Sequence, residues 1–207
     1  MAGPFGRERF DEARLINIAN GMSAARVLLV PVFAYLLISY RFRAALAVFA
    51  ACGASDILDG LVARWLRQRT IVGFLLDPIA DKLLMATAFV VLAIVKVIPA
   101  WLTILVISRD VFILAGSVLI LLLFGAGDLR VATLSKWNTG IQIVTVCFFL
   151  TAKAFPGIWS LFPGNAEELV TGAVVAVCAF STAASGLHYL LIGIRKLSEQ
   201  GQQGGLS

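Results

Sequence analysis

Residues 55–82 read SDILDGLVARWLRQRTIVGFLLDPIADK, and this stretch decides how the rest of the chain is interpreted. It contains two pairs of aspartates, the first spaced i,i+3 and the second i,i+4: Asp56 with Asp59, and Asp77 with Asp81. At these spacings, the two carboxylates of a pair share one face of a helix. Both pairs stand in strongly apolar sequence, where an ionised carboxylate is costly and is usually retained for a function.

The segment between the two pairs is predicted to break the chain into two helices. It is rich in basic residues and contains a glycine: Arg64, Arg67, Arg69 and Gly73. Folding the chain back at this break would bring four carboxylates together beside a basic turn. Such a cluster repels itself unless a cation neutralises it. Because carboxylate oxygens suit Mg²⁺, Mn²⁺ or Ca²⁺, the sequence predicts a divalent-metal site here.

The composition indicates an integral membrane protein. Of 207 residues, 60% are hydrophobic and only 14% are charged, which is far from the average of soluble domains. Polar stretches at 125–138 and 156–165 are predicted to be a connector and a Pro/Gly turn. Six apolar segments are long enough, or nearly so, to cross a hydrocarbon core of about 30 Å: 24–39, 44–62, 74–98, 99–124, 139–155 and 169–194. We therefore expect an all-α bundle of six transmembrane helices.

We expect three parts along the chain: a juxtamembrane segment at 1–23, a six-helix membrane domain at 24–196 and a flexible tail at 197–207. Apolar residues between Phe5 and Ile18 favour a short N-terminal helix lying on the membrane surface. A solvated tail is an equal alternative for the first ten residues. This segment has no apolar h-region and is not poor in acidic residues, so neither a signal peptide nor a transit peptide is predicted.

Basic residues predict how the bundle is oriented. The N-terminus, the break after Arg64, the connector and the end of the last span lie on one side and carry more Lys and Arg. The opposite side carries fewer: Arg41, Arg43, Lys96 and Lys153. The richer side is normally cytoplasmic, so we expect a cytoplasmic membrane protein with both termini inside. The aspartates would then lie near the cytoplasmic face, where water-soluble nucleotides can reach them.

The full pattern is Asp56-x-x-Asp59-Gly60-x-x-Ala63-Arg64, then eight residues, then Gly73-x-x-x-Asp77-x-x-x-Asp81. It resembles the signature of the CDP-alcohol phosphotransferases, with all eight specified residues at the family's spacing. The resemblance begins before the first span, at Asn17-Ile18-Ala19-Asn20, and extends to the sixth segment. Family members join a CDP-linked donor to an alcohol and release CMP. The resemblance implies a six-helix membrane bundle with a preceding surface helix, commonly a homodimer.

The resemblance also implies roles for the signature residues. Asp56, Asp59 and Asp77 would ligate divalent ions, two Mg²⁺ or Mn²⁺, with Asp81 close to the second ion. Asp81 would also be the general base that takes the proton of the acceptor hydroxyl. Small residues would let cytidine approach a helix closely, and Arg64 would offer a planar fork to phosphate oxygens. The implied CDP-binding set is Asp56, Asp59, Gly60, Ala63, Arg64 and Gly73.

Motifs outside the signature favour one acceptor. Asp77-Pro78-x-Ala80-Asp81-Lys82 is typical of members that act on glycerol-type acceptors. Three further stretches resemble the cardiolipin synthases of the family: Ile107-Ser108-Arg109-Asp110-Val111, Leu134-Ser135-Lys136-Trp137-Asn138-Thr139 and Phe180-Ser181-Thr182-Ala183-Ala184-Ser185. We therefore expect transfer of a phosphatidyl group from CDP-diacylglycerol to a hydroxyl of phosphatidylglycerol. Glycerol 3-phosphate, the acceptor of the phosphatidylglycerophosphate synthases, is the alternative.

Charge supports the same preference. Ser117 and Asn138 stand where the phosphatidylglycerophosphate synthases usually have basic residues. Glycerol 3-phosphate is a dianion that is best held by several cations, whereas phosphatidylglycerol is a monoanion and needs fewer. Arg109 and Lys136 remain as candidates for binding the acceptor phosphate. The alternatives are a salt bridge for Arg109 and an interfacial anchor for Lys136.

The aspartates have two other interpretations. The carboxylates could pair with Arg64 and Lys82 and serve only to hold helices together. They could also serve a membrane cation transporter, since transporters use acidic residues within the membrane. Transport predicts ion flux without a CDP-lipid, whereas catalysis predicts release of CMP. The expected partners are the two lipid substrates and the bilayer, and no nucleic acid.

Overall fold

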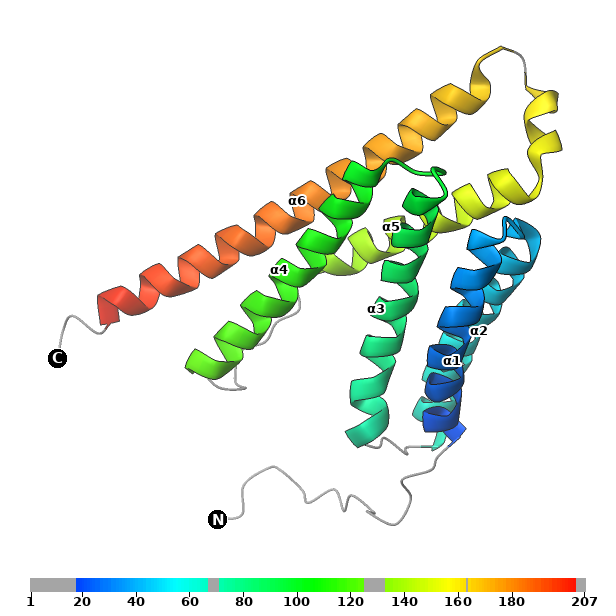
Figure 1. Cartoon of the computed structure of the whole chain (residues 1–207). Coiled ribbons are helices and arrows are strands. Elements are labelled where there is room, and N and C mark those ends of the chain that lie inside the picture. Colours follow the sequence, from blue (N-terminus) through cyan, green and yellow to red (C-terminus); the bar gives the residue numbers. More distant parts are fainter. Residues whose placement is uncertain (1–17, 67–70, 125–132, 163, 204–207) are drawn as a thin grey trace. The chain divides into compact units, whose positions relative to one another are not determined.

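The computed structural model describes the backbone of residues 18–66, 71–124, 133–162 and 164–203. Within these ranges it describes the side chains of residues 25–55, 82–116, 137–162 and 164–191. The described chain is helical and contains no strand, which confirms the all-α prediction for these residues (Figure 1). The helices are α1 (Ile18–Ile38), α2 (Phe42–Leu66), α3 (Ile71–Ile94), α4 (Ala100–Phe124), α5 (Thr133–Ala154), the 3-10 helix η2 (Pro156–Leu161) and α6 (Ala166–Gln203).

Each of the six apolar segments coincides with one α-helix, but some boundaries differ from the prediction. Arg64 and Gly73 were expected in the break, yet α2 continues to Leu66 and α3 begins at Ile71. The break is thus shorter, because Ala, Arg, Trp and Leu at the end of α2 are compatible with a helix. The expected surface helix falls largely in residues 1–17, outside the described part.

The two ends of α5 also differ from the prediction. Helix α5 begins at Thr133, so the second half of the expected polar connector is helical. At its other end, the expected Pro/Gly turn contains η2, with Pro156 in its first turn. A proline fits the first turn of a helix, because the N–H it lacks would have no helical partner there.

The chain divides into two compact units, residues 1–87 and 88–207. In the first unit, α1 and α2 pack side by side as a hairpin (Figure 1). The buried residues of α2 recur at i, i+4 and i+7, which is the period of one helical face: Ala45, Phe49 and Cys52. Phe33 of α1 meets Phe49 with ring centroids 5.7 Å apart. This seam of apolar side chains holds the hairpin together.

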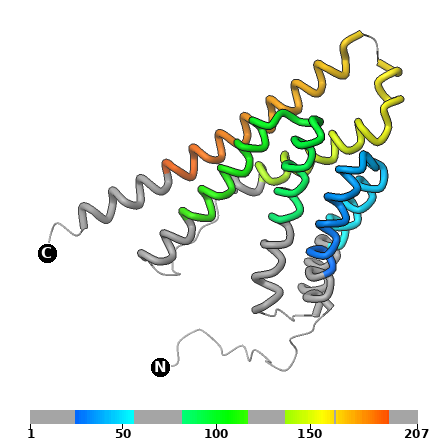
Figure 2. The backbone as a smooth tube through the Cα atoms, viewed as in Figure 1, coloured from blue at the N-terminus to red at the C-terminus, as the bar shows by residue number. Residues whose placement is uncertain are grey.

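In the second unit, α4 and α5 each pack against α6, and Figure 2 shows their backbones beside it. Buried apolar side chains include Leu102 on α4, Phe149 and Leu150 on α5, and Cys178 on α6. The end of α3 is joined to α4 by a hydrogen bond from the Thr103 hydroxyl to the Phe89 carbonyl oxygen, 3.0 Å long. Polar side chains are also buried between these helices, and they form the site described below.

One stretch of the described residues is long and apolar enough to cross a membrane, Ala166–Leu191 on α6. Three shorter apolar helical stretches accompany it: Ala25–Ile38, Phe42–Ser55 and Lys82–Ile94. The count of six spans therefore stays a prediction. Large apolar side chains are nevertheless exposed on α1, α3, α4, α5 and α6; Phe112 is 74% exposed and Phe180 is 78% exposed.

Two helices end in the same hydrogen-bonded cap. After α3, the Val97 amide donates to the Leu92 carbonyl at 2.8 Å and the Lys96 amide donates to the Ala93 carbonyl at 3.0 Å. This is the Schellman pattern, and Lys96 has the positive φ of 59° that the pattern requires. Tyr40 has a φ of 56° at the corresponding position after α1. Neither position has the glycine that best tolerates this conformation.

We expect the cap at Lys96 to discriminate between side chains. Asparagine visits the left-handed region readily, whereas a β-branched residue there is strained by about 1–2 kcal/mol. Lys96→Val should therefore unfold at a lower temperature than Lys96→Asn, measured by thermal unfolding of the detergent-solubilised protein. Both variants remove the same charge, so the comparison isolates the backbone effect. Equal unfolding temperatures would contradict the prediction.

Candidate functional site

The signature residues lie on two consecutive helices. Asp56, Asp59, Gly60, Ala63 and Arg64 are on α2, at positions i, i+3, i+4, i+7 and i+8. Helical periodicity places these five positions on one stripe of α2. The helical state that the aspartate spacing requires is thus present. Their side chains are outside the described part, so their contacts with one another stay a prediction.

The second half of the signature follows the same rule on α3. Gly73, Asp77 and Asp81 are spaced i, i+4 and i+8, which again gives one stripe of a helix. Their side chains also lie outside the described part. Among the side chains that are described, no group of three or more His, Cys, Asp and Glu residues is placed to hold a metal ion. The four signature aspartates are not among those side chains, so the predicted metal site is not tested by this observation.

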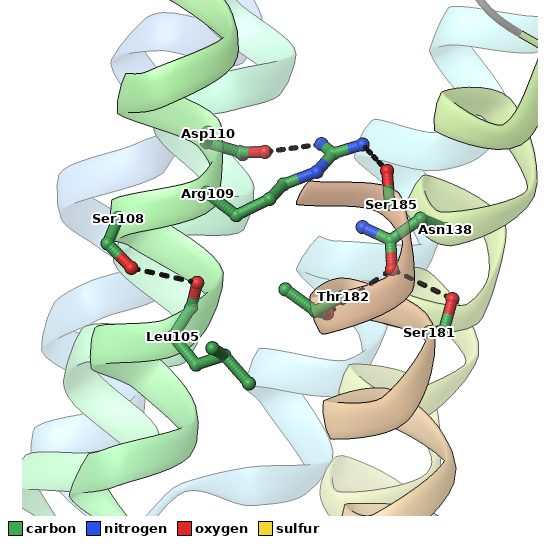
Figure 3. A network of polar contacts seen from close by, with 8 residues as sticks. All are labelled: Leu105, Ser108, Arg109, Asp110, Asn138, Ser181, Thr182 and Ser185. Atoms are coloured by element: carbon green, nitrogen blue, oxygen red, sulfur yellow. Dashed lines mark hydrogen bonds and ion pairs between the residues drawn. The ribbon is translucent and has the colours of Figure 1, made fainter. Parts of the chain in front are cut away.

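A polar cluster lies between α4, α5 and α6, and its side chains are described. We use the name "inter-helix cluster" for Arg109, Asp110, Asn138, Ser181, Thr182 and Ser185 (Figure 3). Arg109 of α4 is only 4% exposed. Its Nη1 donates to Asp110 Oδ1 at 2.7 Å, and its Nη2 donates to Ser185 Oγ at 2.6 Å. The guanidinium charge is therefore balanced by a carboxylate on its own helix and tied to α6.

Asn138 of α5 forms the other half of the inter-helix cluster. Its Oδ1 accepts hydrogen bonds from the Ser181 hydroxyl at 2.9 Å and from the Thr182 hydroxyl at 3.2 Å. Asn138 is 1% exposed, and its Nδ2 has no hydrogen-bond partner. These contacts join α5 to α6. In Figure 3, the carboxamide oxygen points to the α6 hydroxyls and the nitrogen carries no dashed line.

The sequence of α6 allows two helices to approach it at the inter-helix cluster. Ser181, Thr182 and Ser185 are spaced i, i+1 and i+4, so neighbouring positions of one face carry hydroxyls. Small hydroxyl side chains permit close helix packing and can hydrogen-bond across the interface. Gly186 adds to this, since a Cβ at that position would lie 3.6 Å from Arg109 Cγ. α6 therefore presents a narrow polar seam to α4 and α5.

The two predicted acceptor-binding residues have different outcomes. Arg109 is in the inter-helix cluster, where it makes the ion pair that was weighed as its alternative role. Lys136 lies on α5, and its side chain is outside the described part. The acceptor roles of both residues stay predictions. Arg109 is on α4 and Lys136 is on α5, whereas the signature aspartates are on α2 and α3, and no described contact joins them.

Gln142 is a buried polar residue that the sequence did not single out. It lies one turn after Asn138 on α5, is 1% exposed, and its Nε2 has no hydrogen-bond partner. The available signal was a glutamine four residues after an asparagine in an otherwise apolar segment. That spacing puts both amides on one face of the helix. The burial of the two amides makes them candidates for a site, and only the structure shows that burial.

The family model described as CDP-alcohol phosphatidyltransferase matches residues 16–184, which is most of the chain. The chain belongs to this family. The match includes the signature on α2 and α3 and all but one residue of the inter-helix cluster, Ser185.

The individual relatives have names of lipid synthases. The chain is 34% identical over 193 residues to the human protein named cardiolipin synthase (CMP-forming), with 86% of the chain and 62% of that protein covered. It is 32% identical to the rat protein of the same name, covering 86% of the chain and 61% of that protein. It is 30% identical to the Mycobacterium tuberculosis protein named "Probable phosphatidylglycerophosphate synthase", covering 89% of the chain and 85% of that protein. The chain spans about three fifths of the length of the two mammalian relatives.

We expect the inter-helix cluster to contribute to stability. Ser185→Ala removes a hydrogen bond to a buried charged group, which should cost about 1.5–3 kcal/mol of unfolding free energy. Ser181→Ala should cost less, because Asn138 Oδ1 keeps the Thr182 hydroxyl. Thermal unfolding in detergent measures both changes. Ser160→Ala is the matched control, since the Ser160 hydroxyl is exposed and bonds only to the Gly157 carbonyl in η2. A cost for Ser185→Ala no larger than that of the control would contradict this assignment.

Proposed function

We propose that this chain is a membrane phospholipid synthase that transfers a phosphatidyl group from CDP-diacylglycerol to the hydroxyl of a glycerol-type acceptor and releases CMP. One observation carries the proposal: the complete eight-residue signature stands on α2 and α3 in a chain that belongs to the CDP-alcohol phosphatidyltransferase family. The helical register supports it, because each half of the signature forms one stripe of its helix.

The donor set suits divalent metal ions. Four carboxylates at helical spacing offer hard oxygen ligands, the chemistry that Mg²⁺ and Mn²⁺ prefer. We assign Asp56, Asp59 and Asp77 as ligands, with Asp81 beside the second ion. When bound, the two ions would neutralise the charge of the pyrophosphate and polarise its phosphoryl oxygens. The resemblance of the signature, not the described side chains, supports this assignment.

The other signature residues would bind and orient the donor. Gly60 and Ala63 leave little side chain on the stripe of α2, which favours close approach of the cytidine. Arg64, one helical position further on the same stripe, would donate its planar fork to phosphate oxygens. Gly73 is helical rather than part of a turn, so its contribution would be space beside α3 instead of a chain reversal.

Asp81 would act on the acceptor. Its carboxylate would take the proton of the acceptor hydroxyl, and the oxygen would form a bond to the phosphorus that carries the diacylglycerol. The bond from that phosphorus to the CMP oxygen breaks, and CMP leaves with the electron pair. A neighbouring carboxylate raises the proton affinity of such a group, which suits a base.

Phosphatidylglycerol is the acceptor that we favour, which would make cardiolipin. Asn138 supports this choice, because it puts a neutral amide where phosphatidylglycerophosphate synthases usually have a basic residue. The two mammalian relatives are named cardiolipin synthase (CMP-forming), which agrees with it. Glycerol 3-phosphate is the alternative acceptor, in line with the name of the mycobacterial relative.

A membrane environment fits the described surface. Phe112 on α4 and Phe180 on α6 are among many large apolar side chains that are exposed, and lipid solvates such groups better than water. Trp101 and Trp137 are exposed near the starts of α4 and α5, where tryptophan anchors commonly lie. Six spans, cytoplasmic termini and a homodimer are part of the same proposal.

The acceptor test measures CMP release by the purified protein with CDP-diacylglycerol and Mg²⁺. We expect turnover with phosphatidylglycerol and little with glycerol 3-phosphate. Excess EDTA should stop the reaction and Mg²⁺ should restore it, because the carboxylates need bound cations. Turnover with glycerol 3-phosphate alone would keep the reaction class and overturn the acceptor. Ion flux into liposomes without CMP release would favour the transporter interpretation instead.

The test of the base is Asp81→Asn. Loss of the proton acceptor should lower the rate of CMP release by about 100-fold or more, while CDP-diacylglycerol still binds. Glu168→Gln is the matched control, since it replaces an exposed carboxylate near the start of α6 by an amide. Normal turnover in Asp81→Asn would remove Asp81 as the base and leave the other signature roles standing.

A further inference from the structure

Two buried amide side chains lie one turn apart on α5. Asn138 and Gln142 are each 1% exposed, and their i,i+4 spacing places them on the same face of the helix. In each, the amide nitrogen has no hydrogen-bond partner. Native proteins rarely leave such donors unpaired, so each unpaired donor calls for a ligand or a water molecule.

Among the described side chains of α5, the unpaired donors lie in these two turns. In the next turn of α5, Thr145 is buried as well, but its hydroxyl donates to the Ile141 carbonyl oxygen at 2.8 Å. Asn138 already uses its oxygen for two α6 hydroxyls, so its nitrogen alone is left over. The two amides thus present N–H donors that carry no positive charge themselves.

Within the inter-helix cluster, the described charges balance. The inter-helix cluster, of which Asn138 is part, contains one cation and one anion, and Arg109 Nη1 lies 2.7 Å from Asp110 Oδ1. Its remaining members are neutral amides and hydroxyls. A dianionic phosphate monoester is best bound by several cations, which the described side chains here do not supply. A monoanionic phosphodiester with hydroxyl groups can be bound by neutral donors.

We propose that the amide nitrogens of Asn138 and Gln142 bind the acceptor lipid, donating hydrogen bonds to oxygens of a monoanionic glycerol phosphodiester headgroup. The inference rests on the proposed function and assigns residues that select the acceptor. Gln142 is the sharper test of the two, because replacing Asn138 would also remove the contacts of its oxygen with Ser181 and Thr182.

The experiment replaces Gln142 by methionine, which keeps the length of the side chain and removes the donors. The apparent KM for phosphatidylglycerol in mixed micelles should rise about three- to tenfold, the loss of one or two hydrogen bonds. The KM for CDP-diacylglycerol should not change. The unfolding temperature should stay the same or rise, because an unpaired buried polar group is replaced by an apolar one.

Thr145→Val is the matched control on the same buried helix face. Its hydroxyl is satisfied within α5, so the KM for phosphatidylglycerol should stay at the parent value. An unchanged KM in Gln142→Met would overturn the inference. A lower unfolding temperature with both KM values raised together would also overturn it, because the amide would then be structural, for instance through an internal water.

The parent protein separates this inference from the proposed function. CMP release with neither acceptor would overturn the proposed function, and the inference with it. Turnover with glycerol 3-phosphate alone would overturn the headgroup assigned here and keep the reaction class. Turnover with phosphatidylglycerol, with the KM unchanged in Gln142→Met, would overturn the inference alone.

Discussion

The inter-helix cluster depends on one constraint: polar groups buried among apolar helices must be satisfied by the chain or by something bound to it. Two nitrogens of Arg109 meet this constraint, one through an ion pair with Asp110 on the same helix and one through a hydrogen bond to Ser185 that connects α4 to α6. Asn138 meets it only in part, through hydroxyls of α6. The satisfied contacts fix the packing of three helices, and the unsatisfied donors indicate where a ligand would be needed.

The helices of this chain could be predicted because their apolar segments are long, and each of the six coincides with an α-helix. The boundaries were predicted less well where polar residues are helical for tertiary reasons. Asn138 was expected at the end of a polar connector, but it lies inside α5, which begins at Thr133, and it bonds to Ser181 and Thr182 of α6. Sequence periodicity does not contain that information, since the partners are more than 40 residues away.

Some residues of the candidate site could likewise be predicted from the sequence, and others could not. The aspartate signature could be identified from the sequence because its chemistry depends on local spacing, and helix α2 has the register that Asp56 and Asp59 require. Gln142 could not, because a glutamine in a helix has no special meaning until its environment is known. Its burial depends on how the helices pack, which no local pattern specifies.

Charge balance connects the inter-helix cluster to the choice of acceptor. A lone buried Arg109 would attract a dianion strongly, but Asp110 neutralises it at 2.7 Å and the amides beside it are uncharged. Removing cations from a site weakens its binding of a phosphate monoester more than its binding of a phosphodiester, because the monoester carries the larger charge. Selectivity between the two acceptors would then come as much from the neutralisation of Arg109 by Asp110 as from the amide donors, since a site also selects by weakening its binding of a competitor.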